Sequence, residues 1–420
     1  MRYCGSCLAL LGAFFCATIA CGASLTWEDA AARAKLANPT LIKASQAIEN
    51  AKLSLSRTYG AFLPSLSASA GVSQSLSFPL PSVAVLYYGT SAGVNGSLSL
   101  FNGFADIASV AQAADDLKVA QQSYRRTLSD VTYRLKRDYI ALVLAQEQVA
   151  LCKRIQEKRG ENMQLIQLKY DAGLEDKGSL LQVQADKASS DFDVNSAERA
   201  RALAVENLIR SIGIDAPEDF IAVSSFTIPS DITPVTLESA ITVTPEYNIG
   251  ALALHKAASL LTSARSGLYP SISLSGGINY SGDNWSSMSE NGWNTGLSLS
   301  YPFFTGGQNF YNAAIGSVAY ETAKQTFRET LQQLRATLAQ GLDSYIDAVE
   351  SVSVSEKSAA SAQVQSDIST EKYLNGLVAY FEWYSVVNSN ISAEKALLNS
   401  RFNALQQQAA WQNLLGEPAR

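Results

Sequence analysis

Few residues in this chain have the types and the spacing that could do chemistry. His255 is its single histidine, so no pair of histidines is available to hold a catalytic metal. The sequence has no phosphate-binding loop and no Gly-x-Ser-x-Gly elbow for a nucleophilic serine. Asp115 and Asp116 are adjacent carboxylates, but they fall in a helical segment and are expected to be solvated on its surface. The sequence therefore predicts no catalytic residue, no cofactor and no metal site, and it disfavours an enzyme.

The N-terminal segment directs the chain to export. A positive start precedes an apolar run and then small residues, which is typical of a signal peptide over residues 1–23. Cleavage before Cys21 would leave a lipidated first residue, whereas cleavage after Ala23 would remove that cysteine; both alternatives stay open. Cys4 and Cys7 have the spacing of half a zinc site but lie inside the signal. The net charge of −6 and the lack of a basic stripe argue against nucleic acid as a partner.

Two segments that are almost free of charge alternate between small polar and apolar residues. No Asp, Glu, Lys or Arg occurs between residues 58 and 105. This pattern predicts a β-hairpin over residues 62–101, with an apolar, proline-containing loop at residues 78–81. A second hairpin is predicted over residues 269–304, with its only charges, Asp283 and Glu290, in the connecting loop.

The lack of charge in these strands has a physical cause if they cross a membrane. A strand needs about 9 to 11 residues to span a bilayer, and a charge that faces lipid at mid-depth costs about 2 to 4 kcal/mol. The mature sequence has no apolar run long enough for a transmembrane helix, so outer-membrane strands are the prediction. Four strands cannot close into a barrel, and several chains must therefore combine. The small polar face would line the pore through Ser67, Ser69, Ser73, Ser97, Ser99, Ser273, Ser275 and Ser298.

The sequence contains an internal repeat. Asn38-Pro39 recurs as Thr244-Pro245, displaced by 206 residues, and Tyr170 to Leu174 recurs as Tyr373 to Leu377, displaced by 203. Such ordered landmarks indicate a duplicated unit. We expect a first structural repeat at residues 24–213, a connector at 214–236, a second repeat at 237–416 and a tail at 417–420. The connector is expected to pack outside the helices; a flexible linker between independent domains is the alternative.

Each predicted hairpin is followed by a very long helix. The first runs from about Phe104 to Tyr170, would be about 100 Å long, and repeats apolar residues such as Leu128, Leu135 and Leu142 at the spacings of a coiled coil. The second runs from Phe310 to Tyr373 with the same property. Such helices must lie along other helices. Within the first, Cys152 is expected to be a buried small apolar residue.

Together, the doubled order of helix, hairpin, long helix, turn and helix, with Tyr170-x-x-Gly173-Leu174 and Tyr373-x-x-Gly376-Leu377, resembles the TolC-like outer-membrane efflux and secretion channels. The resemblance covers the whole mature chain. It implies a mainly α-helical chain with one membrane hairpin per repeat, and a homotrimer with a 12-stranded barrel in outer-membrane lipid on a coiled-coil tunnel in the periplasm. It also implies a passive exit duct that meets a periplasmic adaptor (membrane fusion) protein and an inner-membrane transporter.

The resemblance implies roles for residues of the two turns. The adaptor-docking tip would consist of Ala172, Gly173, Leu174, Asn375, Gly376 and Leu377. The periplasmic constriction would involve Tyr373, Glu382, Ser179 and Ser385. Of these positions only Glu382 keeps an expected acidic group, and Val378 stands where the family has arginine. A gate held by the family's salt bridges is therefore not expected, whereas a cation-favouring ring of Glu382 is.

A fibrous coiled-coil or adhesin protein is the second alternative. It does not require charge-free hairpins at equivalent places in both repeats, and it predicts no membrane conductance. The sequence does not name the exported cargo, and it does not say whether protons or ATP drive the partner transporter.

Overall fold

The computed structural model describes residues 23–80, 83–214, 220–223, 237–283 and 290–417. Residues 1–22 of the predicted signal peptide, including Cys21, and most of the predicted connector lie outside the described residues. The contacts divide the chain into two compact units. The turn unit consists of Met1–Asn38, Arg134–Pro229 and Val349–Gln406, and the strand unit of Pro39–Tyr133, Ser230–Ala348 and Gln407–Arg420. Each unit therefore contains parts of both predicted repeats.

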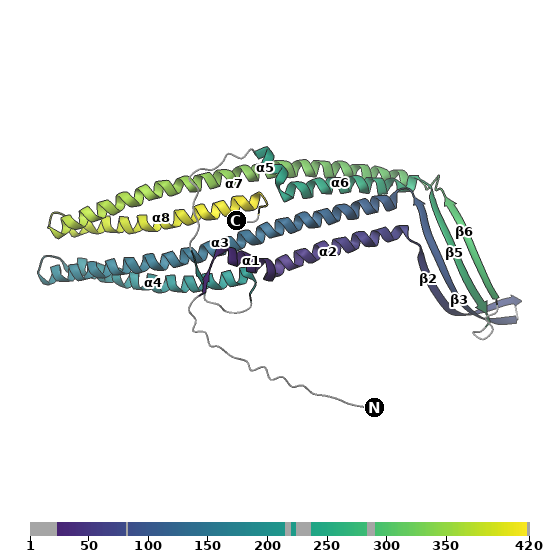
Figure 1. Ribbon diagram of the computed structural model, residues 1–420, viewed down its shortest axis with the longest axis horizontal. Helices are drawn as coiled ribbons and strands as arrows, with labels where there is room; N and C mark the ends of the chain where they lie inside the picture. The colour runs from purple at the N-terminus through teal and green to yellow at the C-terminus, as the bar shows by residue number, and fades with distance from the viewer. Residues whose placement is uncertain (1–22, 81–82, 215–219, 224–236, 284–289, 418–420) are drawn as a thin grey trace, which may run out of the picture. The chain divides into compact units, whose positions relative to one another are not determined.

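The strand unit contains a four-stranded antiparallel sheet in the order β2-β3-β5-β6 (Figure 1). Its strands are β2 (Ser65–Leu80), β3 (Val83–Asn102), β5 (Ser271–Gly282) and β6 (Glu290–Ser300). Helix α2 (Pro39–Tyr59) leads into the first strand, and α6 (Pro245–Arg265), preceded by the short α5 (Leu237–Val243), leads into the third. Two single-turn 3₁₀ helices, η1 (Gly60–Phe62) and η2 (Ser266–Leu268), make these connections.

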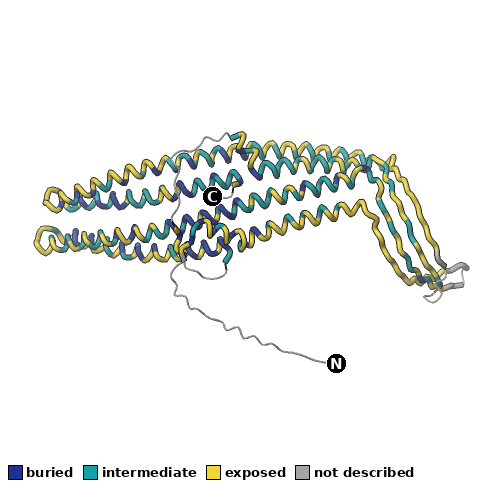
Figure 2. The backbone as a smooth tube through the Cα atoms, in the orientation of Figure 1, coloured by how far each residue is buried: buried dark blue, intermediate teal, exposed yellow. Residues whose placement is uncertain are grey.

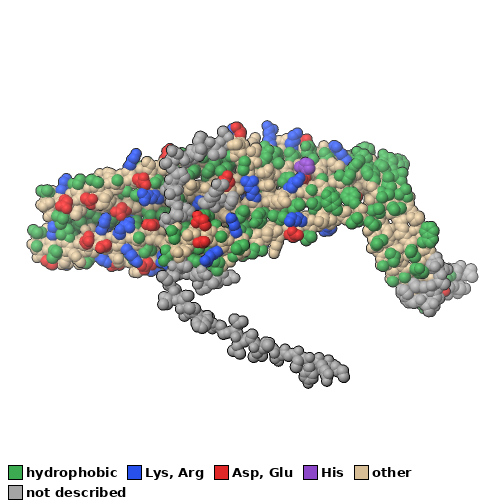
Figure 3. All heavy atoms as spheres, in the orientation of Figure 1, with side chains coloured by type: hydrophobic (Ala, Val, Ile, Leu, Met, Phe, Trp, Pro, Cys, Tyr) green, Lys and Arg blue, Asp and Glu red, His purple; other side chains and the backbone are tan. Residues whose placement is uncertain are grey.

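The strand register gives the sheet two chemically different faces. Residues directly opposite one another in antiparallel strands share a face. Ser69 pairs with Gly93, Gly93 with Asn279, and Asn279 with Gly292, so one face is polar. On the other face Val94 pairs with Ile278, and Ile278 with Trp293. In the visible face of the molecule, charged side chains gather over the helices and are sparse over the strands (Figure 3).

The hairpin ends differ from the predicted ones. The predicted loop at residues 78–81 is wrong, because β2 continues to Leu80 and β3 begins at Val83. A register shift between Ser77 and Leu80 accommodates Pro79. The second return strand ends at Ser300, because Pro302 follows without a backbone N–H. Glu290 is the first residue of β6 and not part of the loop.

The element order confirms a duplicated fold. Helices α2 and α6 both have 21 residues, and the long helices α3 (Ala105–Asp171) and α7 (Gln308–Leu374) both have 67. The helices that follow them, α4 (Lys177–Ile212) and α8 (Tyr380–Leu414), have 36 and 35 residues. Proline begins α2 and α6, as predicted, because its fixed φ suits a first helical turn. No helix among the described residues is both long and apolar enough to cross a membrane.

Asp115 in the strand unit does not match the expectation from the sequence. Its side chain is buried, with an exposed fraction of 2%, instead of being solvated on a helix surface. It bonds to His255 of α6, and Lys118 Nζ lies 3.5 Å from its carboxylate. The neighbouring Asp116 pairs with Lys256 at 2.6 Å. These two contacts join α3 to α6, and the contact with His255 gives the buried Asp115 carboxylate a partner.

The turn unit has its core between helices (Figure 2). Its small parallel sheet pairs β1 (Ala23–Leu25) with β4 (Phe220–Ala222), and the Tyr139 hydroxyl contacts the carbonyl oxygen of Leu25 at 2.7 Å. Helix α1 (Trp27–Ala37) begins at a Thr26 cap. The prediction for Cys152 is confirmed, since it is buried among apolar side chains.

Candidate functional site

Two turns of the turn unit have the same backbone. Gly173, between α3 and α4, has φ 72°, and Gly376, between α7 and α8, has φ 73°. In each turn the following leucine N–H returns to a helix carbonyl at 2.8 Å, from Leu174 to Lys169 and from Leu377 to Lys372. The positive φ is the conformation that glycine adopts without strain. The tight glycine turns expected from the sequence are therefore confirmed.

The predicted docking residues form two exposed tips. Leu174 is 73% exposed and Leu377 is 74% exposed. Ala172 and Asn375 are also exposed, and the Asn375 amide donates to the Glu371 carbonyl at 2.8 Å. Leu377 stands at the rim of a groove of about 560 Å³ whose lining includes Ile368 and Glu371. Each tip thus offers an apolar side chain on a rigid turn, and the docking role stays a prediction.

Tyr373 lies in the core between the two turns. It is 2% exposed and stacks on Trp383, with ring centroids 4.6 Å apart and an angle of 8° between the planes. Its hydroxyl donates to Glu175 Oε1 at 2.5 Å. Lys169 Nζ donates to the Tyr373 carbonyl at 3.0 Å and lies 3.9 Å from the ring centroid. Burial and the Glu175 carboxylate raise the pKa of Tyr373 far above its usual value, so the hydroxyl remains a donor.

The four predicted constriction residues differ in burial. Glu382 and Ser385 are exposed, whereas Tyr373 is buried and Ser179 is 7% exposed. The Ser179 N–H donates at 2.9 Å to Asp176, the residue that caps α4. This bond lowers the pKa of the Asp176 carboxyl below its usual value. Ser179 therefore lies at the start of α4, and its place in a constriction stays a prediction.

The sequence analysis missed a group of contacts that joins α3 and α4 to α8. Arg159 of α3 pairs with Asp186 of α4 at 3.1 Å and bonds to Asn388 of α8. Tyr384 of α8 accepts a hydrogen bond from Gln182 of α4 at 3.0 Å. Burial, and then the nearby Tyr384, raises the pKa of Tyr380 well above its usual value. The aromatic run Tyr380-Phe381-Glu382-Trp383-Tyr384 was the sequence signal that could have located this contact.

All eight serines predicted to line the pore lie on the polar face of the sheet. The register joins Ser67 to Asn95, Ser97 to Ser275, and Ser273 to both Ser99 and Ser298. Every one of the eight serine side chains is exposed in the single chain. Whether this face lines a bore depends on assembly and stays a prediction at this point.

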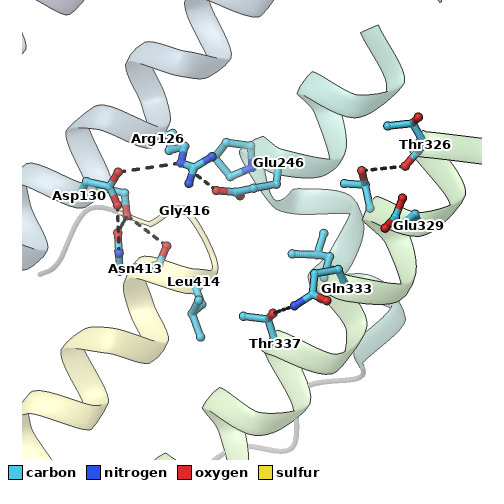
Figure 4. Close-up of a pocket in the computed structure, with 14 residues that line it drawn as sticks. Arg126, Asp130, Glu246, Thr326, Glu329, Gln333, Thr337, Asn413, Leu414 and Gly416 are labelled. Carbon is cyan, nitrogen blue, oxygen red and sulfur yellow. Dashed lines mark hydrogen bonds and ion pairs between the residues drawn. The ribbon is translucent and has the colours of Figure 1, made fainter. Parts of the chain in front are cut away.

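A separate cavity of about 480 Å³ lies in the strand unit between α3, α6, α7 and α8 (Figure 4). Arg126 is its cation and lies 3.2 Å from Glu246 and 3.9 Å from Asp130. Asn413 donates to Asp130 at 3.1 Å. The first contact joins α3 to α6 and the last joins the end of α8 to α3, which is a structural role.

Known proteins share this architecture and resemble the chain in sequence. Residues 30–214 and 244–417 match the family described as "Outer membrane efflux protein". Over 416 residues the chain is 23% identical to outer membrane protein TolC of Vibrio cholerae serotype O1. This alignment covers 94% of this chain and 92% of that protein. A crystal structure of CusC has a TM-score of 0.84 at 18% identity, covering 94% of this chain and 93% of the other. The outer membrane protein VceC of Vibrio cholerae has a TM-score of 0.80 at 18% identity, covering 93% and 96%.

Proposed function

The chain belongs to the outer membrane efflux protein family. We propose that this outer-membrane efflux channel assembles from several copies, opens at its helix turns and binds partner proteins there. Its barrel lies in the outer membrane and most of the chain lies in the periplasm. The fibrous alternative is not supported, because the two matched segments cover both repeats. We infer a homotrimer that serves as the passive exit duct of a tripartite pump or a secretion system, with a periplasmic adaptor and an inner-membrane transporter.

The four-stranded sheet with one uncharged polar face carries this proposal. In the part of the chain that the structure describes, β2 and β6 each pair on one side only. Unpaired strand edges cost several kcal/mol per polar group in lipid, so each edge needs a strand from another copy. Three copies of the sheet would supply twelve strands. The apolar face would then meet lipid and the eight serines would meet water.

Assembly and conductance test the duct directly. Native mass spectrometry of the detergent-purified chain should give a trimer, and planar bilayers should give discrete single-channel steps. Removing residues 290–300, the second strand of the second hairpin, should abolish both results. Strand β5 would become the edge of the sheet and would run parallel, instead of antiparallel, to β2 of the next copy. A stable monomer, or a trimer without conductance under any condition, would contradict the proposal.

The two exposed tips support adaptor docking. Leu174 and Leu377 offer nearly equal apolar surface on glycine turns, and rigid turns lose little entropy on binding. Photo-crosslinking residues placed at either leucine should capture the adaptor encoded with the pump. Leu203 of α4, 63% exposed, is the matched control in mid-helix. Capture from position 203 but from neither tip would contradict docking there.

Tyr373 and Glu175 support a closed state held within one chain. Their hydrogen bond and the Lys169 contact join the α3–α4 turn to the α7–α8 turn. A hydrogen bond to a charged group contributes about 1.5 to 3 kcal/mol, which suffices to favour one of two conformations. We propose that opening separates these turns, and that Glu382 then favours cations at the entrance.

Channel recordings separate these two roles. Tyr373→Phe should raise the open-channel frequency, because it removes the donor to Glu175 while retaining the stacked ring. Tyr170→Phe, at the equivalent position of the first repeat, should leave it unchanged. Glu382→Gln should reduce cation selectivity, measured as a reversal potential in a salt gradient, without changing how often the channel opens. Equal recordings for wild type and Tyr373→Phe would rule out the proposed restraint.

A further inference from the structure

Asparagine and glycine alternate in the middle of the sheet's polar face. One row of directly opposed residues across the four strands reads Ser67, Asn95, Gly277 and Asn294. The next row reads Ser69, Gly93, Asn279 and Gly292. We call Asn95, Asn279 and Asn294 the amide belt. Each of its members has a glycine opposite it on at least one neighbouring strand.

At two of these glycines, an asparagine amide lies where a side chain's Cβ atom would be. A Cβ atom at Gly93 would collide with Asn279 Oδ1, and it would also lie 3.1 Å from the Ile278 carbonyl oxygen. A Cβ atom at Gly277 would collide with Asn95 Oδ1 and lie 3.3 Å from Asn294 Oδ1. The amides therefore lie across neighbouring strands, against the sheet. We call Gly93 and Gly277 the seat glycines.

Two of the three amides also contact each other. The Asn279 Nδ2 atom lies 3.4 Å from Asn294 Oδ1 on the adjacent strand, a weak hydrogen bond that favours the flat arrangement. Glycine inside a strand costs about 0.5 to 1 kcal/mol relative to alanine and marks a close approach. The close approach here is that of the amide side chains.

We propose that the seat glycines set the width of the bore at the amide belt. The inference rests on the proposed function, which turns the polar face toward the bore. A side chain at position 93 would force the Asn279 amide to rotate away from the sheet, and one at position 277 would do the same to the Asn95 amide. Because the polar face lines the bore, an amide that leaves the sheet projects into the bore. Because the belt is repeated in each copy, a small displacement per chain narrows the aperture from several sides at once. The seat glycines thus decide how large a cargo can pass the barrel.

Gly292 provides the matched control. It lies on the same face and in the same row as Gly93, opposite Asn279 on the other neighbouring strand. A Cβ atom at Gly292 would meet nothing within 4 Å. Gly292→Val therefore adds the same volume to the polar face as Gly93→Val, but without displacing an amide.

Labelling from outside the cell measures the width. Ser273→Cys places a thiol on the polar face, two rows nearer the helices than the belt's first row, so reagents added outside must pass the belt. Thiol-reactive polyethylene glycols of graded size are applied to whole cells, and wild type without this cysteine gives the background. In the Ser273→Cys background, Gly93→Val should slow labelling by the largest reagents at least tenfold and leave the smallest unaffected. Gly292→Val should change the rates by less than twofold.

A compensating change completes the test. Asn279→Ala in the Gly93→Val background should restore labelling by the large reagents, because the displaced amide is gone. If Gly93→Val prevents assembly, Gly93→Ala still brings a Cβ atom onto Asn279 and should give a smaller decrease in the same order of sizes. Equal slowing by Gly93→Val and Gly292→Val, or no restoration by Asn279→Ala, would overturn the inference while leaving the duct intact. If Ser273→Cys alone reacts with no reagent, the proposed orientation of the face fails, and the inference fails with it.

Discussion

The two helix turns share a backbone and differ in side chains. Gly173 and Gly376 have φ values within a degree of one another, and both turns return a leucine N–H to a lysine carbonyl. Yet Tyr170 is 37% exposed, whereas its counterpart Tyr373 is 2% exposed. The backbone of a turn therefore does not determine which of its side chains are buried.

The residues that follow each turn explain the difference. After the first turn come Glu175, Asp176 and Lys177, and 203 residues later come Val378, Ala379 and Tyr380. The first repeat thus supplies carboxylates and the second supplies aromatic rings, so the two turns bind each other instead of behaving as equal copies. The two repeats share the turn backbone, and their different side chains form a contact between unlike partners.

Removing the Trp383 side chain should have the largest effect on the difference between the two turns. Because it is 1% exposed and stacks on Tyr373, Trp383→Ala should destabilise the turn unit by about 3 to 5 kcal/mol. Phe381→Ala, two residues away and 77% exposed, should cost no more than about 0.5 kcal/mol. Hydrogen exchange of the α7 and α8 amides near the turn measures both. Comparable protection in the two variants would show that the aromatic stack does not stabilise the turn.

A smaller effect is expected for the bond between the two repeats. In a double-mutant cycle, Tyr373→Phe and Glu175→Ala should show a coupling energy of about 0.5 to 3 kcal/mol. Tyr170→Phe combined with Glu175→Ala should be additive, because no hydrogen bond joins those side chains. Denaturant unfolding in detergent, followed by tryptophan fluorescence, reports each variant. Additivity at Tyr373 would remove the basis for a closed state held by the bond between Tyr373 and Glu175.

The sequence predicted the turns well because glycine requirements are local. Positive φ at Gly173 and Gly376 follows from the residue type, and the repeat spacing locates the second turn once the first is known. Alternation likewise located the strands to within a few residues and correctly assigned the eight serines to one face. The hairpin loop at residues 78–81 was misplaced, because a bulge lets proline remain inside a strand.

Pairings between distant residues could not be predicted in the same way. Nothing local to Glu175 indicates that the Tyr373 hydroxyl lies 2.5 Å from its carboxylate. Nothing local to Asp115 indicates that its carboxylate bonds to His255. Ser179 was assigned from its spacing to the glycine, but helix capping by Asp176 decides its burial. These contacts depend on how the helices pack against one another. The spacing of apolar residues predicts which face of a helix is buried, but it does not predict which residue of another helix lies opposite that face.

Alanine at each glycine turn should test whether the backbones are equivalent. At φ near 70°, a Cβ atom costs about 1 to 2 kcal/mol, so Gly173→Ala and Gly376→Ala should destabilise by similar amounts. Gly160→Ala inside α3 should have the opposite sign and stabilise by about 0.5 to 1 kcal/mol, since its Cβ atom would meet only Lys187 at 3.6 Å. Thermal unfolding by circular dichroism measures all three. Unequal costs at the two turns would mean that side chains, as well as backbone, restrain one of them.

Alkaline pH should give the smallest and most specific effect. Burial and Glu175 raise the pKa of Tyr373, so the folded state holds this proton more tightly than the unfolded state does. The resulting stabilisation is fully present below a pH of about 10, where tyrosine ionises in unfolded chains, and is lost as the pH rises above that value. The stability difference between wild type and Tyr373→Phe should therefore shrink between pH 9 and pH 11, on the order of one residue's titration. If the two stability curves stay parallel over that range, ionisation of Tyr373 is not linked to unfolding, and its bond to Glu175 holds the turns less tightly than its geometry indicates.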